Sequence, residues 1–248
     1  MIILPILFLI TAIFYSSVGF GGGSTYLALL LIWGIPYHIF PVIALVCNLI
    51  VVSGNSINYV RAGNHNFRLL VPFLIGSIPM AFIGGTLVIT KNFFEILLFL
   101  TLSFAGFLLL INNKSYEERN IIIKKISFIT SMIIGSALGL ISGIVGIGGG
   151  IFLSPILFLL KADKPKTIST TASLFIFVNS LSGVFGQLTK QMVLNEILVY
   201  TPLFVSVLIG GLIGNYLNLK IFTGRILAII TSLLVIFVAA RMAFRIFI

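Results

Sequence analysis

Two glycine-rich stretches are the part of this sequence whose residue types could support binding chemistry. Residues 19–24 read Gly-Phe-Gly-Gly-Gly-Ser and residues 146–151 read Gly-Ile-Gly-Gly-Gly-Ile, each inside a long apolar run. Glycine in a helix interior costs about 0.5–1 kcal/mol relative to alanine, so three in a row predict a broken helix. A helix that restarts after the break directs free N–H groups and its positive dipole end at the break, which is an arrangement that binds anions.

The residues predicted to bind an anion open each restarted helix or lie at membrane depth near it. The backbone candidates are the N–H groups of Gly22, Gly23, Ser24, Gly149, Gly150 and Ile151. The side-chain candidates are the hydroxyls of Ser24, Thr25, Thr171 and Ser173 and the carboxamides of Asn48 and Asn179, which fall at near-equivalent positions in the two halves of the chain. The alternative for the glycines is close helix packing, and for the polar side chains it is helix-to-helix hydrogen bonding.

The composition is that of a polytopic membrane protein. Of the 248 residues, 59% are hydrophobic and 8% are charged, whereas soluble domains carry about 25% charged residues. The formal charge of +10 comes from basic residues scattered at the ends of apolar runs, as orientation signals are, so no nucleic-acid partner is expected. The single cysteine, Cys47, rules out a disulfide framework. We find no metal-ligand cluster, nucleotide motif or nucleophile–base pair, and therefore expect no enzyme activity, cofactor or metal.

The apolar segments fall into two halves that follow one plan. The halves are residues 1–111 and 126–248, joined by a polar linker at 112–125. The glycine clusters align at an offset of 127 residues, and Gly84 aligns with Gly214, and Pro72 with Pro202, at an offset of 130. Tandem duplication explains this pattern and is common in transporters, while chance alignment of Gly-, Pro- and Leu-rich segments is the alternative. Residues 1–17 lack a basic start and are interpreted as a retained helix, not a secretory signal.

The positions of lysine and arginine discriminate between two topologies. If each glycine-broken segment crosses the bilayer, there are eight spans and the two sides hold nine and six basic residues. If each is a re-entrant hairpin, the halves are inverted and the count becomes eleven against four. The positive-inside rule favours the hairpins and a cytoplasmic linker, although residues 2–18 would form a helix of about 25 Å, nearly a full span. We predict an all-α membrane protein of two inverted repeats, each with a glycine-broken helix and about three spanning helices.

The glycine motifs and their surroundings resemble the TauE/SafE family of sulfite exporters, also called the TSUP family. The resemblance is carried by residues 19–23, by residues 143–150 with Pro155 beyond them, and by residues 44–48, 59–63 and 171–173. It implies a bacterial-type plasma-membrane permease for small sulfur-containing anions such as sulfite and sulfonates. The first half departs from the pattern because the proline expected soon after its glycines is missing. The family is broad, so the resemblance leaves the substrate open.

The positions of the charged residues bear on the direction in which an anion would be transported. No acidic or basic residue lies in the middle of an apolar run, so the relay that proton pumps use is not visible. An interior-negative potential drives anions outward by about 2.3 kcal/mol per charge per 100 mV. We therefore expect an exporter of small sulfur-containing anions in the cell membrane. An anion-selective channel, a permease coupled to Na⁺ or H⁺, and an assembly factor stay open as alternatives. The expected partners are the anion and the lipid bilayer, and homodimerisation is left open.

Overall fold

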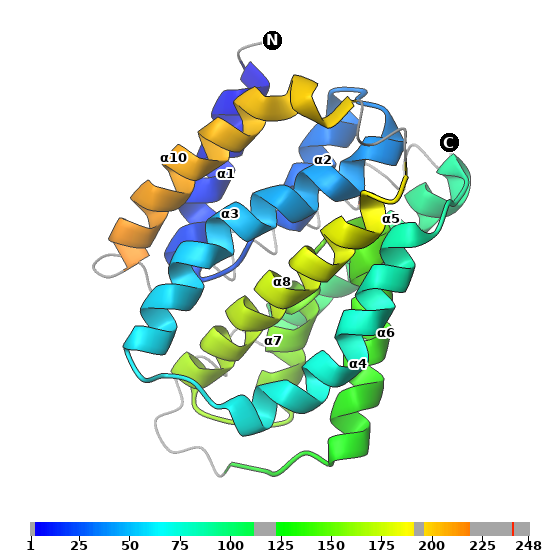
Figure 1. Cartoon of the computed structure of the whole chain (residues 1–248). Helices are drawn as coiled ribbons and strands as arrows, with labels where there is room; N and C mark the ends of the chain where they lie inside the picture. The colour runs from blue at the N-terminus through cyan, green and yellow to red at the C-terminus, as the bar shows by residue number, and fades with distance from the viewer. Residues whose placement is uncertain (1–2, 112–122, 191–195, 219–239, 241–248) are drawn as a thin grey trace.

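The computed structural model describes residues 3–111, 123–190, 196–218 and 240. Most of the predicted linker and most of the last predicted segment, residues 226–248, lie outside the described residues. The described residues form helices and no strand, which confirms the all-α prediction (Figure 1). The long helices are α1 (Ile3–Val18), α2 (Gly23–Ile32), α3 (Phe40–Arg61), α4 (Phe67–Thr86), α5 (Lys91–Ile111), α6 (Phe128–Val145), α7 (Gly150–Leu159), α8 (Pro165–Gln187) and α10 (Thr201–Asn218). Two 3₁₀ turns, η1 (Tyr37–Ile39) and η3 (Ile197–Tyr200), precede α3 and α10.

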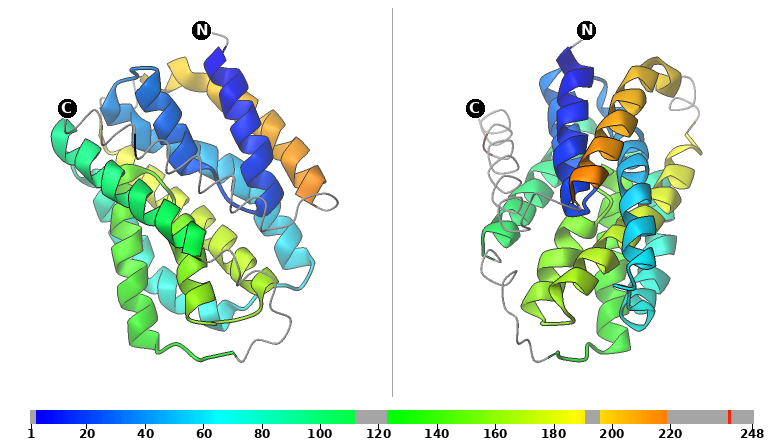
Figure 2. Two further views of the ribbon diagram at one scale, coloured as in Figure 1. Left: turned by 180° about the vertical axis from the view of Figure 1, so that it is seen from behind. Right: turned by 90° about the vertical axis from the view of Figure 1, so that its left-hand side faces the viewer.

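Both glycine stretches break a helix, as the sequence predicts. The first lies between α1 and α2, and the second lies between α6 and α7. The chain turns back at each break: α2 returns towards the end from which α1 came, and α7 returns towards the end from which α6 came (Figures 1 and 2). In the orientation of Figure 1, α1 and α2 form a hairpin that opens upward, and α6 and α7 form a hairpin that opens downward.

Contacts between loops place the two ends of the second hairpin together. The backbone N–H of Lys124, just before α6, donates to the carbonyl of Lys161, just after α7, at 3.0 Å. The side chain of Asn66, in the α3–α4 loop, donates to Asp163 in the α7–α8 loop at 2.7 Å. These loops therefore share one end of the molecule, which is the arrangement that re-entrant hairpins require. The orientation of the two halves in a membrane stays a proposal.

Helix packing reproduces the offsets found in the sequence. Gly84 on α4 packs against the carbonyl of Leu140 on α6, and Gly214 on α10 packs against the carbonyl of Ile13 on α1, with no room for a side chain at either glycine. The two glycines are 130 residues apart and the two carbonyls are 127 residues apart. The first helix of each half thus packs against the other half at matching points, which supports a duplication.

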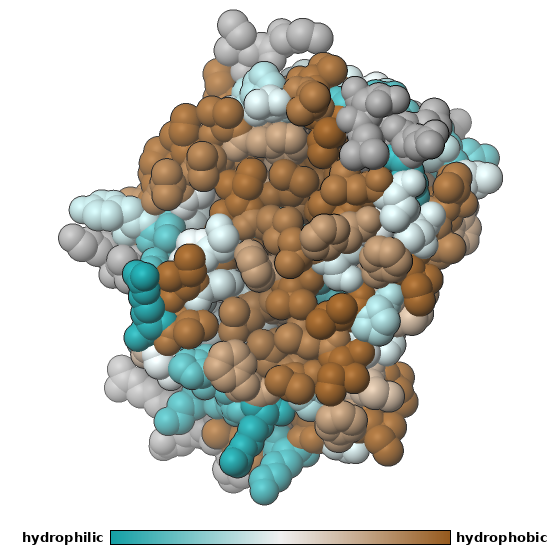
Figure 3. All heavy atoms as spheres, viewed as in Figure 1, coloured by the Kyte–Doolittle hydropathy of each residue, from teal (hydrophilic) through white to brown (hydrophobic). Residues whose placement is uncertain are grey.

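Five helices among the described residues are long and apolar enough to cross a membrane, namely α3, α4, α6, α8 and α10 with its preceding turn. In the most hydrophobic 18-residue stretch of α3, 72% of the stretch is buried inside the protein, against 28% for the corresponding stretch of α10. Helix α3 is therefore central and α10 is peripheral. Apolar side chains cover the middle of the face viewed in Figure 3, and hydrophilic ones gather at its lower end. The protein is a multi-pass membrane protein with α3 and α8 at its centre.

Candidate functional site

The two glycine breaks meet in the interior of the protein, and Asn48 on α3 joins them. The Asn48 side chain is fully buried, and its Nδ2 donates to the carbonyl of Ile147 in the second stretch at 3.1 Å. The same side chain packs against Gly21 and Gly23 of the first stretch, where a Cβ would collide with it. A Cβ on Gly23 would also lie 2.9 Å from the Ile147 carbonyl oxygen. The two stretches are therefore in direct contact.

Each restarted helix begins on a glycine that has left-handed backbone geometry. Gly22 and Gly149 are the N-caps of α2 and α7, with φ of 88° and 77°. In α2, the N–H groups of residues 25 and 26 are the first to bond within the helix, both to the carbonyl of residue 22. In α7, residues 152 and 153 repeat this pattern with residue 149. The N–H groups of residues 23, 24, 150 and 151 precede these bonds, as the first N–H groups of a helix do.

The cavity between the two stretches is small. Its volume is about 10 Å³, which is the space that about one water molecule needs. Its wall includes Gly22, Gly23, Ser24, Ile147 and Ile151. A sulfur oxyanion is much larger than a water molecule, so the structure describes a closed arrangement. An anion could bind between the stretches only if they move apart.

In the first half, the predicted hydroxyls lie beside Tyr15 of α1. The Tyr15 hydroxyl is 2.7 Å from Thr25 Oγ1 and 3.4 Å from Ser24 Oγ. Thr25 is therefore held by Tyr15, and Ser24 is in only marginal contact with it. Tyr15 could not be identified from the sequence, because a tyrosine nine residues before Ser24 carries no local signal that it will fold back on that serine.

In the second half, the predicted side chains bond to the protein itself. Thr171 Oγ1 donates to the Thr167 carbonyl at 2.8 Å, and Asn179 Nδ2 donates to the Phe175 carbonyl at 2.9 Å, both within α8. Ser173 Oγ lies 3.2 Å from Ser56 Oγ on α3 and links the two central helices. These contacts fix α8 and its junction with α3.

Asn179 does not contact the second glycine stretch in the way that Asn48 contacts the first. In the first half, Asn48 packs against residues 21 and 23. In the second half, the side chain of Ile176 packs against residues 148 and 150, and Asn48 Nδ2 also approaches residue 148. Ile176 therefore faces its glycines as Asn48 faces the first pair, and Asn179 lies almost one turn further along α8. The near-equivalence that the sequence alignment suggested needs this correction. Residues three apart lie on nearly the same helix face but about 4.5 Å apart along the axis, so they meet different neighbours.

Several buried polar atoms on α3 and α8 have no hydrogen-bond partner among the described residues. They include the Oδ1 atoms of Asn48 and Asn179, both carboxamide atoms of Asn55, and Ser180 Oγ. Ser180 Oγ would lie 3.1 Å from a Cβ on Gly148, so it borders the second glycine stretch. A buried polar group without a partner costs about 1–3 kcal/mol. Polar groups in this situation are typical of a route used by a solute or by water.

A groove opens between α3 and α8 at the end of the molecule that carries the α3–α4 loop. Its volume is about 400 Å³, and Ser53, Ser56 and Arg61 of α3 and Phe177 of α8 are among its lining residues. Arg61 is exposed at the end of α3, and Ser56 is the residue that contacts Ser173. The groove thus extends from a cationic mouth to the junction of the two central helices.

Comparisons with known proteins agree with a transport role. The family model described as "Sulfite exporter TauE/SafE" matches residues 4–242. The probable membrane transporter protein y4hK of Sinorhizobium fredii is 26% identical over 233 residues, which cover 93% of each chain. The probable membrane transporter protein YunE of Bacillus subtilis is 24% identical over 260 residues, which cover 95% of this chain and 94% of the relative. No solved structure matches the chain.

Proposed function

The chain belongs to the sulfite exporter TauE/SafE family of membrane transporters, and from that premise we propose that it exports small sulfur-containing anions such as sulfite or organosulfonates. Family membership and the names of the relatives support a transporter, not an enzyme. The substrate class and the outward direction are our proposals, based on the glycine stretches and on the absence of charged residues in the middle of apolar runs.

The convergence of two helix N-termini on one cavity is the observation that carries the proposal. Residues 22–24 at the start of α2 and Ile151 at the start of α7 line the same small cavity. A helix N-terminus is equivalent to about half a positive elementary charge, so two of them together offer about one. That charge suits a monovalent anion, and it needs no lysine or arginine at membrane depth.

Asn48 acts in this proposal as a positioning residue. One N–H of its carboxamide is used by the Ile147 carbonyl at 3.1 Å, and the second faces the Gly146 carbonyl at 3.5 Å, beyond the distance of a good hydrogen bond. Asn48 therefore holds the second glycine stretch against the first. Its second N–H is available to an anion once the stretches separate. Thr171, Ser173 and Asn179 do not line the small cavity, and we propose that they reach the anion from α8 only after the stretches separate.

The cavity between the stretches is too small for an open pore in this structure, and we propose a carrier. An open pore would need a continuous passage, whereas the space between the stretches is about 10 Å³. We assign residues 1–111 and 126–248 to two inverted repeats whose hairpins enter from opposite sides, with a cytoplasmic linker at 112–125. Movement of one repeat against the other would then open the site to each side in turn.

Tracer flux in proteoliposomes tests the proposal. We expect purified protein to move sulfite or a sulfonate with saturable kinetics and counterflow, faster when an imposed potential repels the anion from its compartment. Flux that does not saturate would select a channel, and a folded protein that moves none of sulfite, thiosulfate, sulfonates and sulfate would refute the proposal. Gly22→Leu and Gly149→Leu test the site, because unchanged flux in either folded variant would exclude it.

Cation-coupled uptake is the second candidate. It is favoured by the buried oxygens of Asn55, Asn179 and Ser180, which have no partner among the described residues and could bind Na⁺ without a carboxylate. Flux measured with and without a Na⁺ gradient separates the two functions. Export predicts flux that depends only on the anion gradient and on the potential, whereas coupled uptake predicts accumulation driven by Na⁺.

A further inference from the structure

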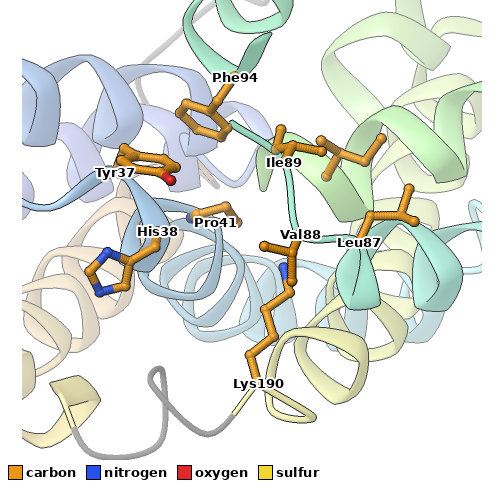
Figure 4. A pocket seen from close by; sticks show the side chains of 9 residues that line it. Tyr37, His38, Pro41, Leu87, Val88, Ile89, Phe94 and Lys190 are labelled. Carbon is orange, nitrogen blue, oxygen red and sulfur yellow. The ribbon is translucent and has the colours of Figure 1, made fainter. Parts of the chain in front are cut away.

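A second pocket lies at the opposite end of the molecule from the Arg61 groove. It has a volume of about 100 Å³ and is bounded by η1, the start of α3, the α4–α5 connection and the chain just after α8 (Figure 4). This is about ten times the volume of the cavity between the glycine stretches. A water molecule needs about 10–15 Å³ on this measure, so the pocket has room for a small oxyanion and several waters.

Lys190 supplies the cationic group of this pocket. Its Nζ donates to Gln187 Oε1 at 3.0 Å, and Gln187 Nε2 donates to the carbonyl of Gly143 at 2.8 Å. Gln187 is fully buried, so the backbone of α6 fixes the carboxamide and the carboxamide fixes the ammonium. In Figure 4 the Lys190 side chain extends into the pocket towards Val88, and the Tyr37 hydroxyl points into the pocket from another side.

The ammonium has an apolar surrounding and no acidic partner among the described residues. Most of the lining is apolar, with Pro41, Val88 and Phe94 among the contributors. Glu196, the nearest acidic residue along the chain, is bound to His38 Nε2 at 3.1 Å. Burial lowers the pKa of Lys190, which reflects the cost of keeping a charge in this setting. A bound anion would offset that cost.

The inner wall of the pocket belongs to the second glycine hairpin. Ile144 of α6 lines the pocket, and Gly143, beside it, accepts the hydrogen bond from Gln187. Gly146, where the glycine stretch begins, packs so closely against the backbone of Pro41 that no side chain fits between them, and Pro41 is also a lining residue. An anion that leaves the second hairpin on this side would therefore meet this pocket first.

We propose that this pocket is a second anion-binding site, in which the Lys190 ammonium and the Tyr37 hydroxyl bind the transported sulfur oxyanion between the glycine stretches and the surface. The inference rests on the proposed function, because it takes transport of such an anion as given. It adds a place on the route, two residues that contact the anion, and Gln187 as the residue that positions the ammonium.

Charge removal at Lys190 tests the site, with Lys91 as the matched control. Lys91 is an exposed cation at the same end of the molecule and does not line the pocket. In proteoliposomes, Lys190→Met should raise the half-saturating concentration of methanesulfonate on that face by about tenfold, the size expected for one charge-assisted contact. Lys91→Met removes the same charge and should leave it within about twofold. Lys190→Arg should recover most of the wild-type value.

The pH dependence provides a readout that a structural role would not change. Binding needs the charged ammonium, so wild-type affinity is complete below the lowered pKa of Lys190 and falls as the pH rises through it. The Lys190→Arg variant should keep its affinity to about pH 10, because arginine stays protonated there. The other titratable groups at this end, among the described residues, are Tyr37, which lines the pocket, the His38–Glu196 pair, Tyr200 of η3, and Lys91 and Glu95 of α5. Both proteins share them.

The two levels of the proposal fail in different ways. If wild-type protein transports the anion but Lys190→Met and Lys91→Met behave alike, the outer site is wrong and the proposed function stands. If wild-type and Lys190→Arg proteins lose affinity at the same pH, the Lys190 ammonium does not bind the anion. If folded wild-type protein moves no sulfur anion, the proposed function itself fails.

Discussion

Replacement of Asn48 by alanine tests the contact that joins the two glycine stretches. The 3.1 Å bond to the Ile147 carbonyl has good length, whereas the 3.5 Å approach to Gly146 does not, so the substitution removes one effective hydrogen bond. Ile147 is only 4% exposed, so its carbonyl loses its partner in a buried place. The expected cost is about 1–3 kcal/mol, the penalty for an unsatisfied buried acceptor.

The same energy predicts the loss of transport. If Asn48 holds the two stretches in their binding geometry, 1–3 kcal/mol corresponds to a flux reduced by about 5- to 150-fold. Asn58, on the same helix, is the matched control. Its side chain donates a 3.0 Å hydrogen bond to Asn215 on α10, so Asn58→Ala also removes one interhelical bond, but not one to a glycine stretch. Asn58→Ala should cost about 1 kcal/mol and leave flux within about twofold.

Thermal unfolding in detergent and tracer flux in proteoliposomes measure the two effects separately. We expect both variants to unfold at lower temperature and only Asn48→Ala to lose flux. If Asn48→Ala transports as well as Asn58→Ala at equal stability loss, then Asn48 contributes to packing alone. The idea that it positions the anion site would then be wrong.

Three further predictions concern the hairpins and the central helices. Gly149→Ala forces a side chain into left-handed geometry at φ 77°, so we expect a cost of about 1–2 kcal/mol and a flux reduced by about 5- to 30-fold, measured against wild-type protein at equal reconstitution. The double variant Ser56→Cys, Ser173→Cys should form a disulfide between α3 and α8, because the two hydroxyls are 3.2 Å apart. Oxidation should stop flux and a reductant should restore it. Unchanged flux after oxidation would show that α3 and α8 do not move apart during transport. Lys164→Cys and Lys91→Cys should react with an impermeant thiol reagent from opposite sides of the membrane, whereas eight spans would put both on one side.

The sequence was sufficient to predict the all-helical fold and the breaks at the glycines, while the inverted repeat stays a prediction. Apolar runs and triple glycines are local signals, which can be read without knowledge of the fold. The repeat offsets reappear in packing that no alignment could show. Gly143 packs against the Ala81 carbonyl, and at the corresponding place Ser16 Oγ donates to the Gly211 carbonyl at 2.8 Å. Residues that the proposed repeat aligns therefore pack at corresponding places.

The side-chain partners of the site could not be predicted in the same way. The contact of Tyr15 with Thr25 depends on how sharply the first hairpin turns, and the bond from Asn48 to Ile147 joins residues 99 positions apart. The alignment of Asn48 with Asn179 was misleading because Ile176 occupies the corresponding place against the glycines. Such contacts depend on helix rotation and on long-range packing, which hydrophobic patterning determines only coarsely.

The location of a bound anion tests the central claim most directly. Selenite is a close chemical analogue of sulfite, and selenium is located in crystals by its anomalous scattering. We predict an anomalous peak between residues 22–24 and residues 149–151, within hydrogen-bonding distance of backbone N–H groups from both stretches. A peak found elsewhere in the protein, with these N–H groups unoccupied at a saturating concentration of selenite, would contradict the claim that the glycine hairpins form the anion site.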